Sequence, residues 1–184
     1  MGYTHYWRQL RDFTDTEWQE LTRLTKLITA DGLGVLAHHP ESHEEYHGKW
    51  GEDDVLTIDD ESIYFNGIGE DSHETFCITK KKRAKMDYEE QEAYDKQGAF
   101  EFCKTAHKPY DKYVTAVLCA IYNMFGHYNM TPMSEITSDG NSDDWKEGMF
   151  HAVRSTREEE MSIPFQETLC LSYVDWLDSE KKTG

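Results

Sequence analysis

Residues 109–128, PYDKYVTAVLCAIYNMFGHY, decide the fold. Apolar side chains recur along this stretch at helical spacing and form one wide stripe, which comprises Val114, Val117, Leu118, Ile121 and Phe125. Pro109 suits the first turn of a helix, because its missing N–H would have no partner there in any case. The pattern therefore predicts a largely buried helix that organises the core.

Strands and two further helices are predicted on either side of that helix. Residues with high β-propensity predict strands at 2–8, 55–58, 62–66, 74–79, 99–105 and 134–138. Thr14 and Ser142 are expected to cap helices that end near Asp31 and Arg154, and 169–176 is expected to form a strand or a short helix. The order shows no βαβ rhythm. It predicts an α+β fold, a mostly antiparallel sheet covered on one face by two or three helices, with long polar loops.

Composition indicates one acidic globular domain, residues 1–184. The chain has 36 Asp and Glu against 19 Lys and Arg, so its net charge is −17, and it is too aromatic, at 13%, for a disordered tail. No apolar run approaches the roughly 18 residues that span a bilayer, and the four cysteines lack disulfide-scaffold spacing. We expect a cytoplasmic protein that binds neither membranes nor nucleic acid directly.

A formal HExxH motif occurs at 43–47, within a polar excursion at about 38–53. On a helix this spacing puts His43 and His47 on one face, where they could bind zinc with Glu44 as the base. Pro40 and Gly48 bracket the motif, and its neighbours are polar. A solvated His-rich loop is therefore the preferred interpretation, no metal is expected, and a zinc-dependent hydrolase is the third functional alternative.

Positive charge gathers just before the buried helix. Lys104, His107 and Lys108 lie in the segment FCKTAHKPYD, 102–111, and the first N–H groups of a helix attract anions. In a chain of net charge −17 such a cluster is informative. We expect it to bind a small anionic, nucleotide-like ligand, with aromatic walls from Tyr3, Tyr6 and Trp7. Alternatively, the lysines are simply solvated and Asp111 satisfies the helix start.

The sequence does not decide whether the protein is an enzyme, and it requires no cofactor. His5 is a candidate catalytic residue, because an imidazole suits proton transfer near neutral pH. Cys103 is a second candidate, because a nearby helix N-terminus would favour its thiolate.

These candidates are expected to meet in space. The strand 2–8, the strand end at 102–105, the helix start at 109–111 and the strand-to-helix turn at 138–141 should converge. The predicted ligand-binding set is Tyr3, His5, Tyr6, Trp7, Lys104, Thr105, Lys108, Asp111 and Asp139. One pocket can contain them only if His5 and Lys104 lie on the same side of the sheet, within roughly 15 Å. Otherwise His5 and the tyrosines hydrogen-bond within the core.

An ordered set of short motifs resembles a family of short, uncharacterised bacterial and phage proteins that open with GYTHYW. The set extends from residue 2 to about 150 and comprises GYTHYW (2–7), FNG (65–67), ETF (74–76), FCKTA (102–106) with KPYD (108–111), and SDG (138–140) with Trp145. Beside that pattern, the excursions at 38–53 and 80–97 and an accessory segment after about 155 look like additions. The resemblance implies no activity.

A phage origin would place the protein in the host cytoplasm and would suit an accessory protein. The alternative to ligand binding is an acidic inhibitor that binds a basic host protein, one that acts in defence or binds nucleic acid. Its support is the charge of −17.

Overall fold

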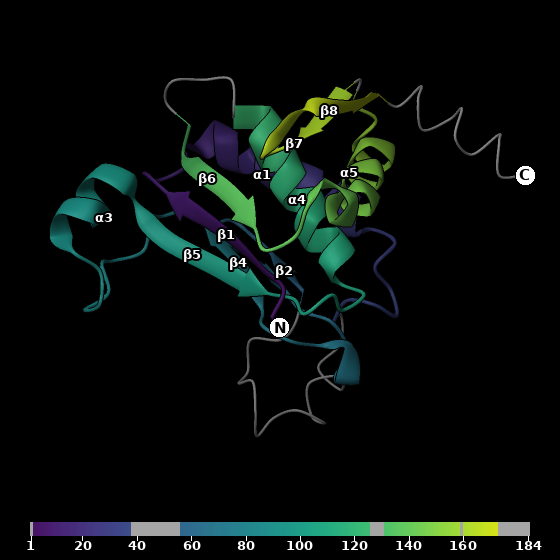
Figure 1. The fold of residues 1–184 in the computed structure, drawn as a ribbon, viewed down its shortest axis with the longest axis horizontal. Coiled ribbons are helices and arrows are strands. Elements are labelled where there is room, and N and C mark those ends of the chain that lie inside the picture. Colours follow the sequence, from purple (N-terminus) through teal and green to yellow (C-terminus); the bar gives the residue numbers. More distant parts are fainter. Residues whose placement is uncertain (1, 38–55, 126–130, 159, 173–184) are drawn as a thin grey trace, which may run out of the picture.

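The computed structural model of the chain describes residues 2–37, 56–125, 131–158 and 160–172 (Figure 1). Its helices are α1 (Asp15–Thr29), the 3-10 helix η1 (Gly69–Asp71), α3 (Gln91–Gln97), α4 (Asp111–Phe125) and α5 (Ser142–Thr156). Its strands are β1 (Thr4–Gln9), β2 (Thr57–Ile58), β3 (Ser62–Phe65), β4 (Phe76–Thr79), β5 (Ala99–Lys104), β6 (Met133–Ser138), β7 (Glu160–Ile163) and β8 (Gln166–Ser172).

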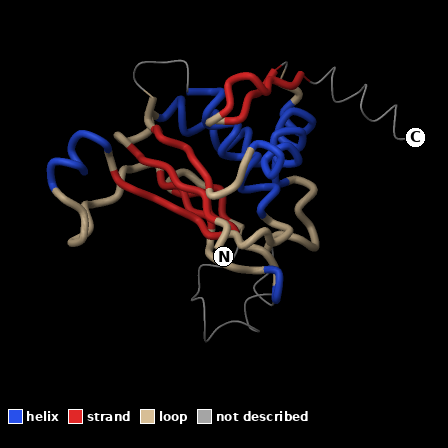
Figure 2. Tube along the Cα trace, in the orientation of Figure 1, coloured by secondary structure: helices blue, strands red, loops and turns tan. Residues whose placement is uncertain are grey.

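All strand pairs in the described residues are antiparallel, and the α+β class is confirmed. The strands are divided between a sheet of order β5-β1-β6, a sheet of order β2-β3-β4 and the hairpin β7-β8. Helices α1, α4 and α5 gather on one side of the sheet β5-β1-β6, whereas α3 lies apart at the other end of the molecule (Figures 1 and 2). No described helix is long and apolar enough to cross a membrane.

Helix α4 is the central helix of the core, as its sequence predicts. Every residue from Tyr113 to Ile121 is buried. Its neighbour α5 approaches very closely at Gly148, where an added Cβ would lie 1.9 Å from Thr115 Oγ1. Trp7 of β1 packs from the sheet side, with its ring 5.4 Å from that of Phe76. The buried face of β1 is thus covered by the same core that surrounds α4.

Both long flanking helices begin with a capping box, a reciprocal pair of bonds between the capping residue and the third helical residue. Thr14 caps α1 as predicted, with Glu17 as its partner. The prediction that Ser142 caps α5 is wrong by one residue. Asn141 is the cap, and the carboxylate of Asp144 accepts from its backbone N–H at 2.8 Å. Asn and Ser are comparable caps, so the acid three residues after Asn141 decides the position.

Two elements lie in segments with little apolar periodicity. The charged excursion at 80–97 contains the short helix α3, which has no buried residue. Strand β7 was not predicted, because Met161 and Ile163 are the only apolar side chains of a short acidic segment. Both are buried, and their burial explains the strand.

The charged excursion is tied to β5 by the ion pair of Arg83 and Glu89, at 2.6 Å. Arg83 also donates to the carbonyl oxygen of Phe100 at 2.6 Å, and the backbone N–H of Phe100 donates to Glu89 at 3.1 Å. Glu101 makes a second ion pair with Arg83 at 2.6 Å. The bond from Arg83 is the main reason that the pKa of Glu89 is lowered to about 2.

Candidate functional site

The four segments singled out by the sequence meet at one end of the sheet β5-β1-β6. The backbone N–H groups of Thr105 and Ala106 donate to the carbonyl oxygen of Tyr3, each at 3.1 Å. On the other side of β1, the N–H of Asp139 donates to the carbonyl oxygen of Thr4 at 3.0 Å. Because α4 begins directly after the loop that leaves β5, the strand, the loop, the helix start and the turn lie side by side.

At this junction His5 and Thr105 share one carboxylate oxygen of Asp111. His5 Nε2 lies 2.7 Å from Asp111 Oδ1, and the hydroxyl of Thr105 donates to the same atom at 2.5 Å. A carboxylate only accepts, so Nε2 of a neutral His5 is assigned the proton, and Nδ1 then carries the lone pair. Asp111 is the first residue of α4, where the helix dipole also favours a negative charge.

In addition to the hydroxyl of Tyr3, two ring nitrogens beside this network have no hydrogen-bond partner among the described residues. They are Nδ1 of His5 and Nε1 of Trp145, on fully buried rings whose centroids are 5.0 Å apart. One is an acceptor and the other a donor. Buried polar groups are normally paired. The network therefore fixes His5 through Nε2, while the rings of Tyr3 and Trp145 pack edge-on against the imidazole.

The aromatic side chains predicted as ligand walls do not line one pocket. Trp7 is buried in the core, so its prediction as a wall is wrong. Tyr6 lies on the outer face of the sheet, where its hydroxyl donates to Asp139 at 3.2 Å. Tyr3 is buried, with its ring stacked on exposed His107 at a centroid distance of 3.6 Å. Its burial, and then the charge of Asp111, raise the pKa of Tyr3.

His5 and Lys104 lie on opposite faces of the sheet. In an antiparallel pair, opposed residues share a face and successive residues alternate. Cys103 is opposite His5, and Lys104 is opposite Thr4. The condition for a single pocket that contains both His5 and Lys104 is therefore not met. Prediction of the strands alone, without their register, does not assign these faces.

Cys103 is not an activated nucleophile in this structure. It is fully buried, and its Sγ donates to the carbonyl oxygen of Glu74 at 3.4 Å. Burial, followed by the charge of Glu74, raises the pKa of the thiol well above its ordinary value. The prediction that the helix N-terminus favours a thiolate here is wrong, because desolvation outweighs the dipole.

Three lysines lie in the segment 104–112, which leads from the end of β5 into α4, and none forms an ion pair with a carboxylate among the residues described. Lys104, Lys108 and Lys112 are half-buried, and none forms an ion pair there. Lys108 donates to the carbonyl oxygen of Glu70 at 2.6 Å. Lys112 lies over the ring of Tyr113 at 4.7 Å.

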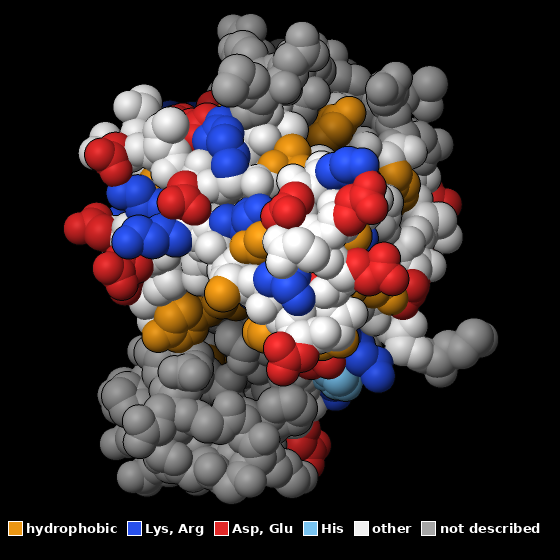
Figure 3. Space-filling view, turned by 90° about the vertical axis from the view of Figure 1, so that its left-hand side faces the viewer, with side chains coloured by type: hydrophobic (Ala, Val, Ile, Leu, Met, Phe, Trp, Pro, Cys, Tyr) orange, Lys and Arg blue, Asp and Glu red, His pale blue; other side chains and the backbone are white. Residues whose placement is uncertain are grey.

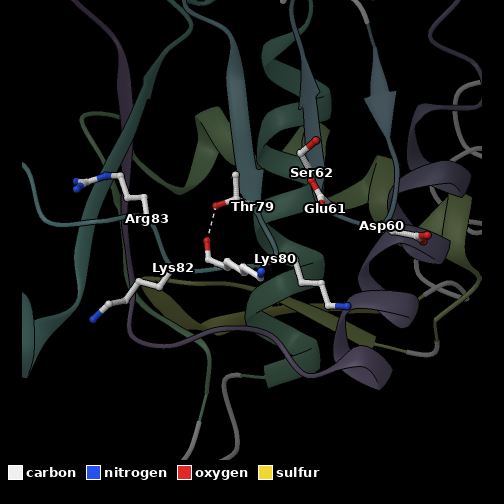
Figure 4. A pocket seen from close by; sticks show the side chains of 8 residues that line it. Asp60, Glu61, Ser62, Thr79, Lys80, Lys82 and Arg83 are labelled. Carbon is white, nitrogen blue, oxygen red and sulfur yellow. Dashed lines mark hydrogen bonds between the residues drawn. The ribbon is translucent and has the colours of Figure 1, made fainter.

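A cavity of about 600 Å³ lies elsewhere, beside the basic segment 80–83 (Figure 4). Its basic side chains do not converge, since Lys82 and Arg83 point away from Lys80 in this view. Lys80 pairs with Asp15, and Arg83 pairs with two glutamates. Asp60 and Glu61 contribute further negative charge to the lining. The charges of this cavity are balanced, and it offers no concentrated anion site.

The surface on the side of α3 and β5 carries charges of both signs (Figure 3). Basic and acidic side chains alternate there, with small apolar areas between them. This face does not present the continuous acidic surface that would mimic a nucleic acid.

Metal binding finds no support in the described residues. Among them, no group of three or more His, Cys, Asp and Glu side chains is placed to hold a metal ion. His43 and His47 lie outside the described residues, and the zinc hypothesis stays a prediction.

Comparison of the chain with protein-family models, with curated proteins and with solved structures finds no match. Functional inference therefore rests on the geometry described above.

Proposed function

We propose that this protein binds a small anionic ligand at the segment 104–112, which runs from the end of β5 into the first turn of α4. The observation that carries the proposal is the set of three lysines in this segment that have no carboxylate partner among the described residues. Several other basic side chains are paired with carboxylates, such as Arg8 with Glu135, and the unpaired Lys26 and Lys81 differ from the three lysines of this segment in being exposed. In a chain of net charge −17, unpaired lysines at the end of β5 and beside the start of a 15-residue helix provide a local attraction for an anion.

Asp111, at the start of α4, does not cancel this attraction by an ion pair with the lysines. Asp111 is only 13% exposed, and its oxygen accepts from His5 and Thr105. The loop itself is held in an unusual conformation, since Ala106 and His107 both have positive φ, at 51° and 56°. Such backbone is costly for residues other than glycine and is concentrated at functional sites. Both features favour a preorganised loop.

The proposal is for binding and includes no catalytic step. His5 and Cys103 are fully buried, and neither has contact with solvent. The ligand-binding side chains that remain from the predicted set are Lys104 and Lys108, to which the structure adds Lys112 and exposed His107.

Isothermal titration calorimetry with inorganic phosphate, mononucleotides and cyclic dinucleotides tests the proposal. We expect the Lys104→Ala/Lys108→Ala variant to weaken binding by about tenfold or more, which is about 1.4 kcal/mol. The control variant Lys26→Ala/Lys81→Ala removes two exposed lysines elsewhere and changes the net charge equally. It should bind as the parent does. Absence of binding by every ligand tested, or an equal loss of affinity in the two variants, would contradict the proposal.

A further inference from the structure

The outer face of the sheet β5-β1-β6 carries a row of aromatic side chains, of which the sequence analysis included only Tyr6 in the site. Phe102 lies opposite Tyr6 in the pairing of β5 with β1, and Phe100 lies opposite Arg8. Lys104 lies on the same face, two residues after Phe102. The alternation Phe-x-Phe-x-Lys at 100–104 predicts that these three side chains share one face of a strand. The antiparallel register shows that this is the face of Tyr6 and Arg8.

Three of these four paired side chains are held by their neighbours. The rings of Tyr6 and Phe100 stack at 6.0 Å with an interplanar angle of 19°. The guanidinium of Arg8 lies 5.2 Å from the centroid of Phe100 and is fixed by an ion pair with Glu135 at 2.8 Å. A rigid aromatic surface of this kind loses little conformational entropy when it binds a second ring.

Phe102 is the exposed member of the row. It is 49% exposed, although an apolar ring of this size is usually much more buried, and its centroid is 6.1 Å from that of Phe100. Among the described elements, α1, α4 and α5 lie on the opposite side of the sheet (Figure 1). An exposed ring beside a cation without a carboxylate partner is complementary to a planar ligand that carries negative charge.

We propose that Phe102 stacks the base of a mononucleotide whose phosphate is bound by Lys104, and this inference rests on the proposed function. An aromatic ring on a sheet face stacks a base regardless of base identity, and the neighbouring lysine supplies attraction for the phosphate. The net charge of −17 disfavours a long polyanion, so the ligand is a mononucleotide rather than a nucleic-acid strand.

Calorimetric titration of the full chain with AMP, adenosine, inorganic phosphate and a 12-residue oligothymidylate tests this assignment. We expect AMP to bind more tightly than phosphate or adenosine and more tightly than the oligonucleotide. Phe102→Ala should weaken AMP binding about tenfold or more, in line with about 1–3 kcal/mol per stacked base, and should leave phosphate binding unchanged. Phe102→Trp should retain AMP binding, with indole fluorescence quenched by the base.

Tyr88→Ala is the matched control, since Tyr88 is an aromatic side chain that is 72% exposed in the charged excursion. It should bind AMP as the parent does. Equal affinities for AMP and phosphate, with binding still dependent on Lys104, would overturn the stacking inference and leave the proposed function standing. Preference for the oligonucleotide would overturn the assignment to a mononucleotide. Absence of binding by every probe would overturn both proposals.

Discussion

Replacement of Asp111 by alanine should destabilise the protein far more than an equivalent change at an exposed helix start. The substitution removes one carboxylate oxygen that accepts from both His5 and Thr105. Hydrogen bonds to charged groups contribute about 1.5–3 kcal/mol each, and shared partners make the two bonds less than additive. The loss of favourable charge at the helix start adds about 0.3–1 kcal/mol. We therefore expect a loss of about 3–5 kcal/mol in the free energy of unfolding.

Asp143→Ala is the control, because Asp143 also lies in the first turn of a 15-residue helix. Its side chain is 77% exposed and pairs only with Lys146, so the expected loss is below about 1 kcal/mol. The helix dipole acts on both aspartates, and the difference between the two variants therefore isolates the buried network. Urea denaturation followed by tryptophan fluorescence measures both.

Asp111→Asn keeps an acceptor oxygen and should fall between the parent and Asp111→Ala. It also keeps the test decisive if the alanine variant does not fold, since failure to fold itself indicates a large loss. A free energy of unfolding for Asp111→Ala within about 1 kcal/mol of that for Asp143→Ala would refute the network argument.

Three further predictions use the same denaturation assay. Gly148→Ala should lower the free energy of unfolding by about 2 kcal/mol or more, because the added Cβ would lie 1.9 Å from Thr115 Oγ1. The steric cost of this clash exceeds the gain of roughly 1 kcal/mol in helix propensity, and a more stable variant would contradict the close packing. Trp18→Phe should lower the free energy of unfolding by about 1–2 kcal/mol more than Trp145→Phe, because the Trp18 indole donates to a backbone carbonyl at 2.9 Å and the Trp145 indole has no described partner. Equal losses would show that the Trp145 N–H is paired. The stability that Glu89 contributes should be complete above about pH 4.5 and lost as the pH falls toward about 2, because its folded-state pKa is lowered to about 2; Glu89→Gln should flatten that part of the pH profile, and an unchanged slope would contradict it.

The sequence was most informative where one periodic pattern coincided with clear end signals. Helix α4 and the cap at Thr14 are of this kind, and so is the convergence of chain segments around β1. The face of the sheet on which each strand residue lies could not be predicted. His5 and Lys104 project in opposite directions, and this depends on a register that no local pattern determines. The burial of Cys103 could not be predicted from the local sequence either, since the residues that desolvate its thiol are distant in the chain.

The contacts of Arg83 and Glu89 with Phe100 have a consequence for how the molecule associates with others. A strand at the border of a sheet exposes N–H and C=O groups that can recruit another chain, and aggregation often begins there. At Phe100 a guanidinium and a carboxylate occupy both groups, and at Lys104 the carboxylate and the backbone of Glu74 do the same. Only the short interval around Phe102 separates these two blocked positions, too little for a second strand to pair. The border formed by β5 is therefore protected against pairing with a strand of another molecule, although it lies beside an aromatic face that is open to solvent.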